Sequence, residues 1–118
     1  MQYQSDYILR LIEQMGGLIR RATEKMRTGG AEEPYELADQ AIGLALDMDP
    51  SIASRLSPQS LASLLELGNL DDRVVELVAQ AIELEADVLQ SGGELIAADV
   101  RRDQANAVRS LLGPMHAN

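Results

Sequence analysis

The apolar residues of the chain recur at helical spacing over most of its length. In the first segment they follow steps of three, one and four residues, which places them on one face of a helix over residues 5–27. Ser5 is placed to accept a hydrogen bond from an amide of the first turn, and Gly29 and Gly30 favour a left-handed helix end. The pattern predicts one long amphipathic N-terminal helix with the apolar face Ile8, Leu11, Ile12, Met15, Leu18, Ile19, Ala22 and Met26.

Shorter helices are expected to follow, each delimited by proline, glycine or a capping residue. Pro34 tolerates a first-turn position, and Pro50 excludes helical geometry at the residue before it, so a second helix is expected between these prolines. Ser57 followed by Pro58 predicts the start of a short helix that ends at Gly68. The remaining expected elements are one turn within residues 51–56, a helix over residues 71–90 and a last helix between Gly93 and Gly113.

This pattern predicts an all-α fold. The chain contains no convincing alternation of apolar and polar residues of the kind that β-strands show. We expect five or six helices, with the long N-terminal helix followed by short helical hairpins in a bundle or array. A length of 118 residues favours a single domain over residues 1–118, with residues 115–118 as a disordered tail.

The second expected helix has small residues at Ala38 and Ala45, seven apart, and Pro50 five residues further on. This spacing resembles the second helix of a tetratricopeptide repeat, in which small side chains allow close packing and the proline ends the helix. The hairpin expected across Gly92 and Gly93 has the same topology. The resemblance covers half a repeat and implies a tetratricopeptide-like array.

A distinctive run opens the chain, with the residues Asp6, Tyr7, Ile8, Leu9, Arg10, Ile12, Glu13 and Gln14. It resembles the start of a family of small bacterial proteins that have a domain of unknown function and a helical-hairpin C-terminus. The similarity extends over the whole chain in architecture. It implies a helical fold and no particular activity.

Composition and charge exclude several classes of function. The absence of cysteine removes disulfides and thiolate metal sites. No stretch reaches the roughly 20 consecutive apolar residues that span a bilayer, so we expect a cytoplasmic protein with no membrane association. A net charge of -9 repels phosphate backbones, and no nucleic-acid partner is expected.

The charge is distributed unevenly along the chain. Residues 1–30 carry a net +2, residues 31–100 carry -13 and residues 101–118 carry +2. Such a pattern suits complementary association within one chain or between copies, and it equally suits simple solubility. We expect the basic residues of the terminal helices to form ion pairs with the acidic helices; these residues are Arg20, Arg21, Lys25, Arg27, Arg101, Arg102 and Arg109.

Few residues are suited to catalysis. The one histidine, His116, follows the helix stop at Gly113, where it lacks the rigid surroundings that a base or metal ligand requires. No serine has a histidine partner within the expected helices, so a serine nucleophile is not expected. No catalytic residue and no cofactor is expected.

Carboxylates are the only abundant groups that could hold a metal ion. Glu76, Glu83 and Asp87 line one helical stripe at steps of seven and four, and Glu85 and Asp72 lie nearby in the sequence. An acidic solvated face explains this group best. The alternative is a small metal-dependent enzyme that uses the stripe with help from Asp72.

The leading functional hypothesis is a non-catalytic protein–protein interaction module that forms a homodimer. A first helix of about 23 residues is near 34 Å long, more than the other helices can cover. Its uncovered stripe is expected to be the dimer interface, formed by Ile8, Leu11, Met15, Leu18 and Ile19.

Two further features leave alternatives open. The glycine pair Gly16–Gly17 inside the first helix indicates a mild kink, close packing against another helix, or a crossing point with a second protomer. A shallow groove between hairpins suits a peptide or partner protein, by analogy with tetratricopeptide-like arrays. An apolar-ligand carrier, with a cavity inside the bundle, is a third class of function that the sequence leaves open.

Overall fold

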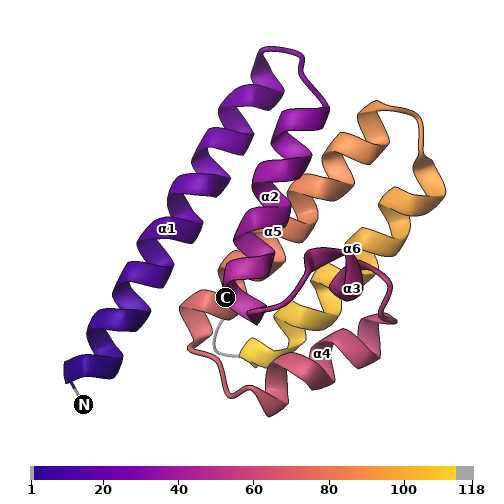
Figure 1. The fold of residues 1–118 in the computed structure, drawn as a ribbon. Helices are drawn as coiled ribbons and strands as arrows, with labels where there is room; N and C mark the ends of the chain where they lie inside the picture. The colour runs from indigo at the N-terminus through magenta and orange to yellow at the C-terminus, as the bar shows by residue number, and fades with distance from the viewer. Residues whose placement is uncertain (1, 114–118) are drawn as a thin grey trace.

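The computed structural model describes residues 2–113, with side chains from Asp6 onward. Over this span the chain is helical and contains no strand, so the predicted all-α fold is confirmed (Figure 1). The expected disordered tail lies outside the described residues. The elements are α1 (Gln2–Arg27), α2 (Glu32–Leu46), α3 (Pro50–Ser54), α4 (Pro58–Leu67), α5 (Asp72–Ser91), α6 (Leu95–Arg109) and a 3-10 turn η1 (Ser110–Leu112).

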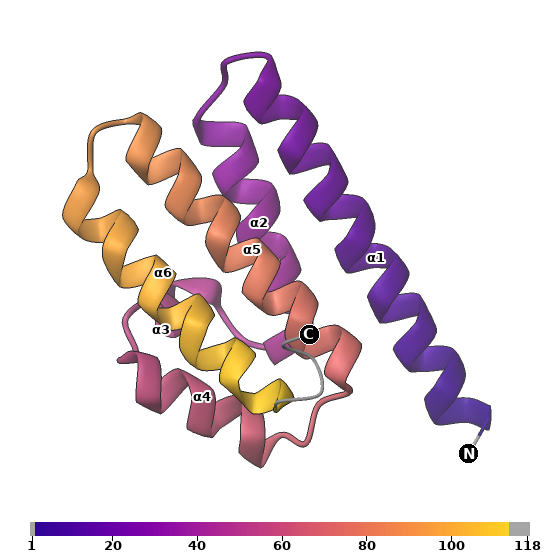
Figure 2. The same ribbon diagram turned by 180° about the vertical axis from the view of Figure 1, so that it is seen from behind.

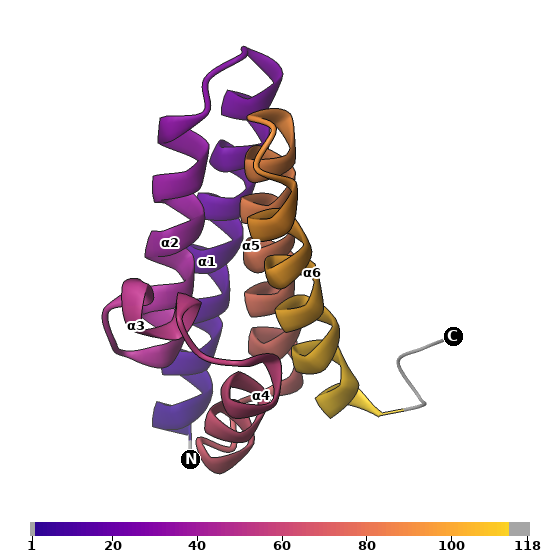
Figure 3. The same cartoon turned by 90° about the vertical axis from the view of Figure 1, so that its right-hand side faces the viewer.

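The helices form two antiparallel hairpins, α1–α2 and α5–α6, joined by the short helices α3 and α4 (Figures 1 and 2). α5 is the central element, because it packs against α1, α2 and α6. α4 packs against α6 and crosses the lower end of the hairpins in Figure 3. The predicted long N-terminal helix and the shorter helical hairpins are therefore both present.

Local capping explains where several helices begin. Ser57 accepts a hydrogen bond from the amide of Ser60 at 3.1 Å, which confirms the cap predicted for α4. Asp49 and Asp71 cap α3 and α5 through the amides of Ser51 and Arg73 at 2.9 and 2.8 Å. The start predicted for the first helix is wrong, because α1 already begins at Gln2, ahead of the proposed cap.

The core is aliphatic and is built around α5. Half of the 20 residues of α5 are buried, since this helix is covered on several sides. Its valines and alanines meet small and branched side chains of the neighbouring helices, with Ala38 from α2 and Ala105 from α6 fully buried. The small side chains let the helices approach closely, which agrees with the spacing of Ala38 and Ala45 in α2.

The expectation that the apolar stripe of α1 is uncovered is wrong for three of its residues. Leu11, Met15 and Leu18 are 8%, 0% and 6% exposed, because α2 and α5 of the same chain both pack on this face. Ile8 and Ile19 are half-buried. In the single chain, Leu11, Met15 and Leu18 therefore offer almost no free surface to a partner. The homodimer itself stays a prediction.

The glycines within helices lie in different surroundings. A Cβ atom on Gly17 would meet nothing nearer than the flexible end of Arg20, at 3.9 Å, so close packing within the chain does not explain this glycine. A Cβ atom on Gly43 would lie 3.3 Å from the carbonyl oxygen of Met48 and 3.5 Å from Cδ of Pro50. Gly43 therefore allows the α2–α3 turn to fold back against α2.

We expect opposite effects when these two glycines are replaced by alanine. Gly17→Ala should raise the free energy of unfolding by about 0.5–1 kcal/mol, because alanine restricts the unfolded chain and favours the helix. Gly43→Ala should lower it by about 1 kcal/mol, because the backbone of the turn must move. Urea unfolding of both variants tests the pair, and equal effects at the two positions would contradict it.

Candidate functional site

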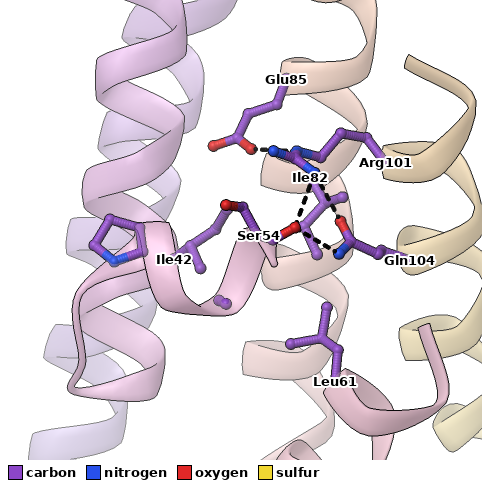
Figure 4. Close-up of a pocket in the computed structure, with 9 residues that line it drawn as sticks. Ile42, Ser54, Leu61, Ile82, Glu85, Arg101 and Gln104 are labelled. Carbon is purple, nitrogen blue, oxygen red and sulfur yellow. Dashed lines mark hydrogen bonds and ion pairs between the residues drawn. The ribbon is translucent and has the colours of Figure 1, made fainter. Parts of the chain in front are cut away.

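A cluster of polar side chains, with the backbone carbonyl of Ser54, interrupts the aliphatic core where four helices meet. We call it the polar junction, and its residues are Tyr35 and Asp39 of α2, Ser54 of α3, Glu85 of α5, and Arg101 and Gln104 of α6. Figure 4 shows Glu85, Arg101, Gln104 and Ser54 converging between α3, α5 and α6. Polar groups buried this deeply require partners, so their contacts decide what the junction does.

Arg101 is the hub of the polar junction. Its side chain is only 13% exposed, and its guanidinium donates in four directions. Nε donates to Oε1 of Glu85 at 3.2 Å, and Nη2 donates to the hydroxyl of Tyr35 at 3.1 Å. Nη1 donates to the carbonyl oxygen of Ser54 and to Oε1 of Gln104, both at 3.3 Å. One side chain of α6 thus connects to α2, α3 and α5.

Gln104 ties the end of α3 to α6. Its side chain is 1% exposed, and Nε2 donates to the carbonyl oxygens of Ser54 at 3.2 Å and Leu56 at 2.8 Å. Carbonyl groups at a helix end lack partners within the helix. Gln104 supplies the missing donors, and the five-residue α3 is held by a side chain from the last helix.

Glu85 is the most deeply buried acid of the junction. It is 1% exposed, and only Oε1 reaches a donor; Oε2 has no hydrogen-bond partner among the described residues. Burial is the main cause that raises the pKa of Glu85, to about 9, and the neighbouring Asp39 carboxylate adds to this effect while Arg101 opposes it. Burial, helped by the charge of Glu85, also raises the pKa of Tyr35.

The sequence interpretation grouped Glu85 with the solvated acidic face, and this is wrong. Glu85 follows Val78 by seven residues and Ile82 by three, which places it on the apolar face of α5. That spacing was the available signal for a buried acid. Gln104 lies six residues after Ala98 and one before Ala105, on the buried side of α6. Nothing in the neighbouring sequence indicates that its amide bonds to the end of α3.

A small cavity borders the polar junction (Figure 4). Its volume is about 10 Å³, which is the space of about one water molecule. It is therefore too small for an apolar ligand, a substrate or a cofactor. The lining residues are Ile42, Pro50, Ala53, Ser54, Leu61, Ile82, Glu85, Arg101 and Gln104.

We expect Gln104→Leu to destabilise the fold by about 2 kcal/mol, because the carbonyl of Leu56 loses the donor that Gln104 provides and the guanidinium of Arg101 loses an acceptor. Urea unfolding measures this loss. Asn106→Leu, an exposed position on the same helix, is the control and should change stability by less than about 0.5 kcal/mol. Equal effects of the two substitutions would contradict a structural role for the amide.

The acidic stripe proposed as an alternative metal site faces arginines instead. Arg109 Nη2 lies 2.9 Å from Oε2 of Glu76, and its Nη1 contacts Glu83. Arg102 Nη2 lies 3.0 Å from Oδ1 of Asp87. Within residues 2–113, no three acidic or histidine side chains are arranged to hold a metal ion. His116 lies outside the described residues.

These contacts confirm the predicted ion pairing for the last helix. Arg102 and Arg109 each form an ion pair with an acid of α5, and Arg101 hydrogen-bonds to Glu85 of the same helix. On the first hairpin, Lys25 Nζ lies 3.6 Å from Oε2 of Glu33, and both side chains are about half exposed. Exposed pairs of this kind add little stability, so the partly buried pairs of α6 matter more.

We expect added Mg²⁺, Mn²⁺ or Ca²⁺ at millimolar concentration to leave the melting temperature unchanged, because a cation would have to displace Arg109 from its contacts with Glu76 and Glu83. Thermal unfolding with and without each cation measures this. A saturable rise in melting temperature that Glu83→Gln abolishes would instead support the metal-site alternative.

A surface groove runs between α1 and α2. Its volume is about 570 Å³, which is in the range of ligand pockets. Tyr7 is 65% exposed and Leu44 is 41% exposed, so apolar surface remains accessible at the groove. The lining residues are Tyr7, Arg10, Leu11 and Gln14 from α1, with Gln40, Gly43, Leu44 and Asp47 from α2 and its end.

The sequence singled out only the α1 side of this groove. Leu11, predicted for the dimer interface, lines it as a buried residue, and the other α1 residues of the groove belong to the distinctive opening run. Gln40, Leu44 and Asp47 were missed as site residues, because a helical pattern does not show which exposed positions lie beside another helix.

Comparisons with known proteins add no relative. No family model, curated protein or solved structure matches the chain. The likeness to tetratricopeptide helices and to the family of small bacterial proteins therefore stays a prediction. No helix in the described part of the chain combines the length and apolar character needed to cross a bilayer.

Proposed function

We propose that the chain is a non-catalytic helical interaction module that forms a homodimer through the groove between α1 and α2. The proposal rests on one observation, which is that a groove of about 570 Å³ opens beside exposed apolar side chains of the first hairpin. This surface replaces the buried part of the interface predicted from sequence. Tyr7 and Leu44 take the place of Leu11, Met15 and Leu18.

The length of α1 supports the same surface. α1 has 26 residues and α2 has 15, so the N-terminal end of α1 extends beyond its partner and away from α4 and α5 (Figures 1 and 2). Tyr7 and Leu9 on this end are 65% and 47% exposed, and Ile8 is half-buried. A second copy that packs here would cover apolar area which the chain itself leaves accessible.

The chemistry of the groove suits a protein partner. Tyrosine and arginine are enriched at protein interfaces because they combine apolar contact area with hydrogen bonding, and Tyr7 and Arg10 provide both. Gln14 and Gln40 offer amide groups that can bind a partner backbone. The described residues that line the groove include no nucleophile paired with a base, which favours binding over catalysis.

Charge favours a second copy as the partner. α1 carries exposed basic residues such as Arg20 and Arg21, whereas the exposed face of α2 carries Glu32 and Glu36. Two copies related by a twofold axis can place the basic helix of one beside the acidic helices of the other. The net positive charge of residues 1–30, in a chain of net charge -9, is compatible with such an arrangement.

We expect the wild-type chain to dimerise at micromolar concentration and Leu44→Asp to raise the dissociation constant at least about tenfold, because a carboxylate would be buried at the interface. Sedimentation equilibrium over a concentration series measures both constants. Leu67→Asp is the matched control, since Leu67 is 86% exposed on α4 and lies outside the groove.

The outcomes separate clearly. Equal dissociation constants for the wild type and Leu44→Asp would place any dimer interface elsewhere. A wild-type chain that stays monomeric at all concentrations would refute self-association. Circular dichroism of both variants should show unchanged helix content, because both leucines are exposed in the single chain.

A further inference from the structure

The polar junction contains two carboxyl groups and one guanidinium. Glu85 of α5 and Asp39 of α2 interact with each other, and Arg101 of α6 bonds to Glu85. If both acids were ionised, the cluster would carry a net negative charge in a region where Glu85 is 1% exposed. Uncompensated charge at such a depth is strongly unfavourable. One proton on the pair would make the cluster neutral.

The hydrogen bonds of the junction indicate where that proton belongs. The guanidinium of Arg101 reaches only Oε1 of Glu85, because its other nitrogens bond to Ser54, Gln104 and Tyr35. Oε2 of Glu85 is buried and receives no donor from the described residues, and it points away from Arg101 in Figure 4. A proton on Oε2 removes the charge from this unpartnered atom and turns it from an acceptor into a donor.

We propose that Glu85 holds a proton in the folded chain at neutral pH, and that this proton is a structural part of the junction between α2, α5 and α6. What binds at this buried position is a single proton. The site lies apart from the residues that line the α1–α2 groove, and the inference does not depend on self-association.

Among the influences on the pKa of Glu85, burial and the neighbouring acid outweigh the arginine. Burial and then Asp39 of α2 raise the pKa of Glu85 to about 9, against the opposing effect of Arg101 of α6. The pKa of Tyr35 of α2 is also raised, so its hydroxyl stays neutral in the same pH range. The contacts of Ser54 and Gln104 come from a carbonyl and an amide, which carry no net charge.

The sign of the pH dependence follows from these values. An ordinary glutamate has a pKa of 4.5, so the unfolded chain loses this proton first, while the folded chain keeps it up to about pH 9. The folded state therefore binds one more proton between these limits. Its stability is complete below about pH 4.5 and falls as the pH rises toward about 9, with no further loss from Glu85 above that.

The decisive variant is Glu85→Gln. The amide oxygen can accept from Arg101 and the amide nitrogen can donate to Asp39, so glutamine reproduces the protonated acid but has no proton to lose. Between about pH 5.5 and 8.5, we expect the unfolding constant of the wild type to rise about tenfold per pH unit relative to that of the variant. At about pH 8 the variant should be the more stable protein.

Asp87→Asn is the matched control on the same helix. Asp87 is exposed and paired with Arg102, so this substitution should leave the pH slope of the wild type unchanged. The other acids of the chain contribute equally to the pH dependence of the wild type and of each variant. Their contribution therefore cancels when the unfolding constants of wild type and variant are compared at each pH. A Glu85→Gln chain that is less stable than the wild type at pH 7 and keeps the wild-type slope would overturn the proposal, because it would show an ionised Glu85 bound to Arg101.

A second measurement does not depend on any variant of Glu85. The ¹³C chemical shift of the Glu85 carboxyl carbon reports its protonation directly, and in the folded wild type we expect the protonated value at pH 7. In Asp39→Asn, the charge that opposes ionisation is gone and an amide can donate to Glu85, so the midpoint should shift to lower pH. An ionised carboxyl signal for Glu85 at pH 7 in the wild type would refute the proposed proton on Glu85.

Discussion

The arrangement of this chain depends on burying one guanidinium where four helices meet. Arg101 is charged and almost enclosed, so each of its donors requires an acceptor at the correct place. Glu85, Ser54, Gln104 and Tyr35 supply these acceptors from α5, α3, α6 and α2. Hydrogen bonds have preferred lengths and directions, so these bonds add a geometric constraint to the aliphatic packing between the helices.

The helices themselves could be predicted because their signals are local. Proline, glycine and capping residues determine the backbone geometry within a few positions. In the structure a helix begins at Pro50 and another at Pro58, after the caps Asp49 and Ser57, and the second of these helices ends at Gly68. That α6 would form ion pairs with α5 could be predicted, because a helix with several arginines follows an acidic helix across a tight turn. The start of α1 was less predictable. Ser5 has the side chain of a capping residue, but it lies inside the helix, which begins at Gln2.

The polar junction and the groove could not be predicted from these signals. The junction joins Tyr35 to Arg101, which are 66 residues apart, and no pattern in either helix specifies the partner. The stripe with Leu11 and Met15 was expected to be free, because its cover by both α2 and α5 depends on how the hairpins stack. Helical periodicity shows which face of a helix is apolar but does not show which neighbour covers it.

The attachment of α3 has a consequence for how the chain acquires its structure during synthesis. The carbonyl groups of Ser54 and Leu56 bond to side chains that are 47 to 50 residues further along the chain. The contacts within the α1–α2 hairpin and those of α3 with α2 are available early in synthesis, but the donors for these two carbonyl groups are available only once α6 has been made. The hydrogen bonds that fix the end of α3 therefore form only after the last helix is available, although α3 itself is synthesised before α5 and α6.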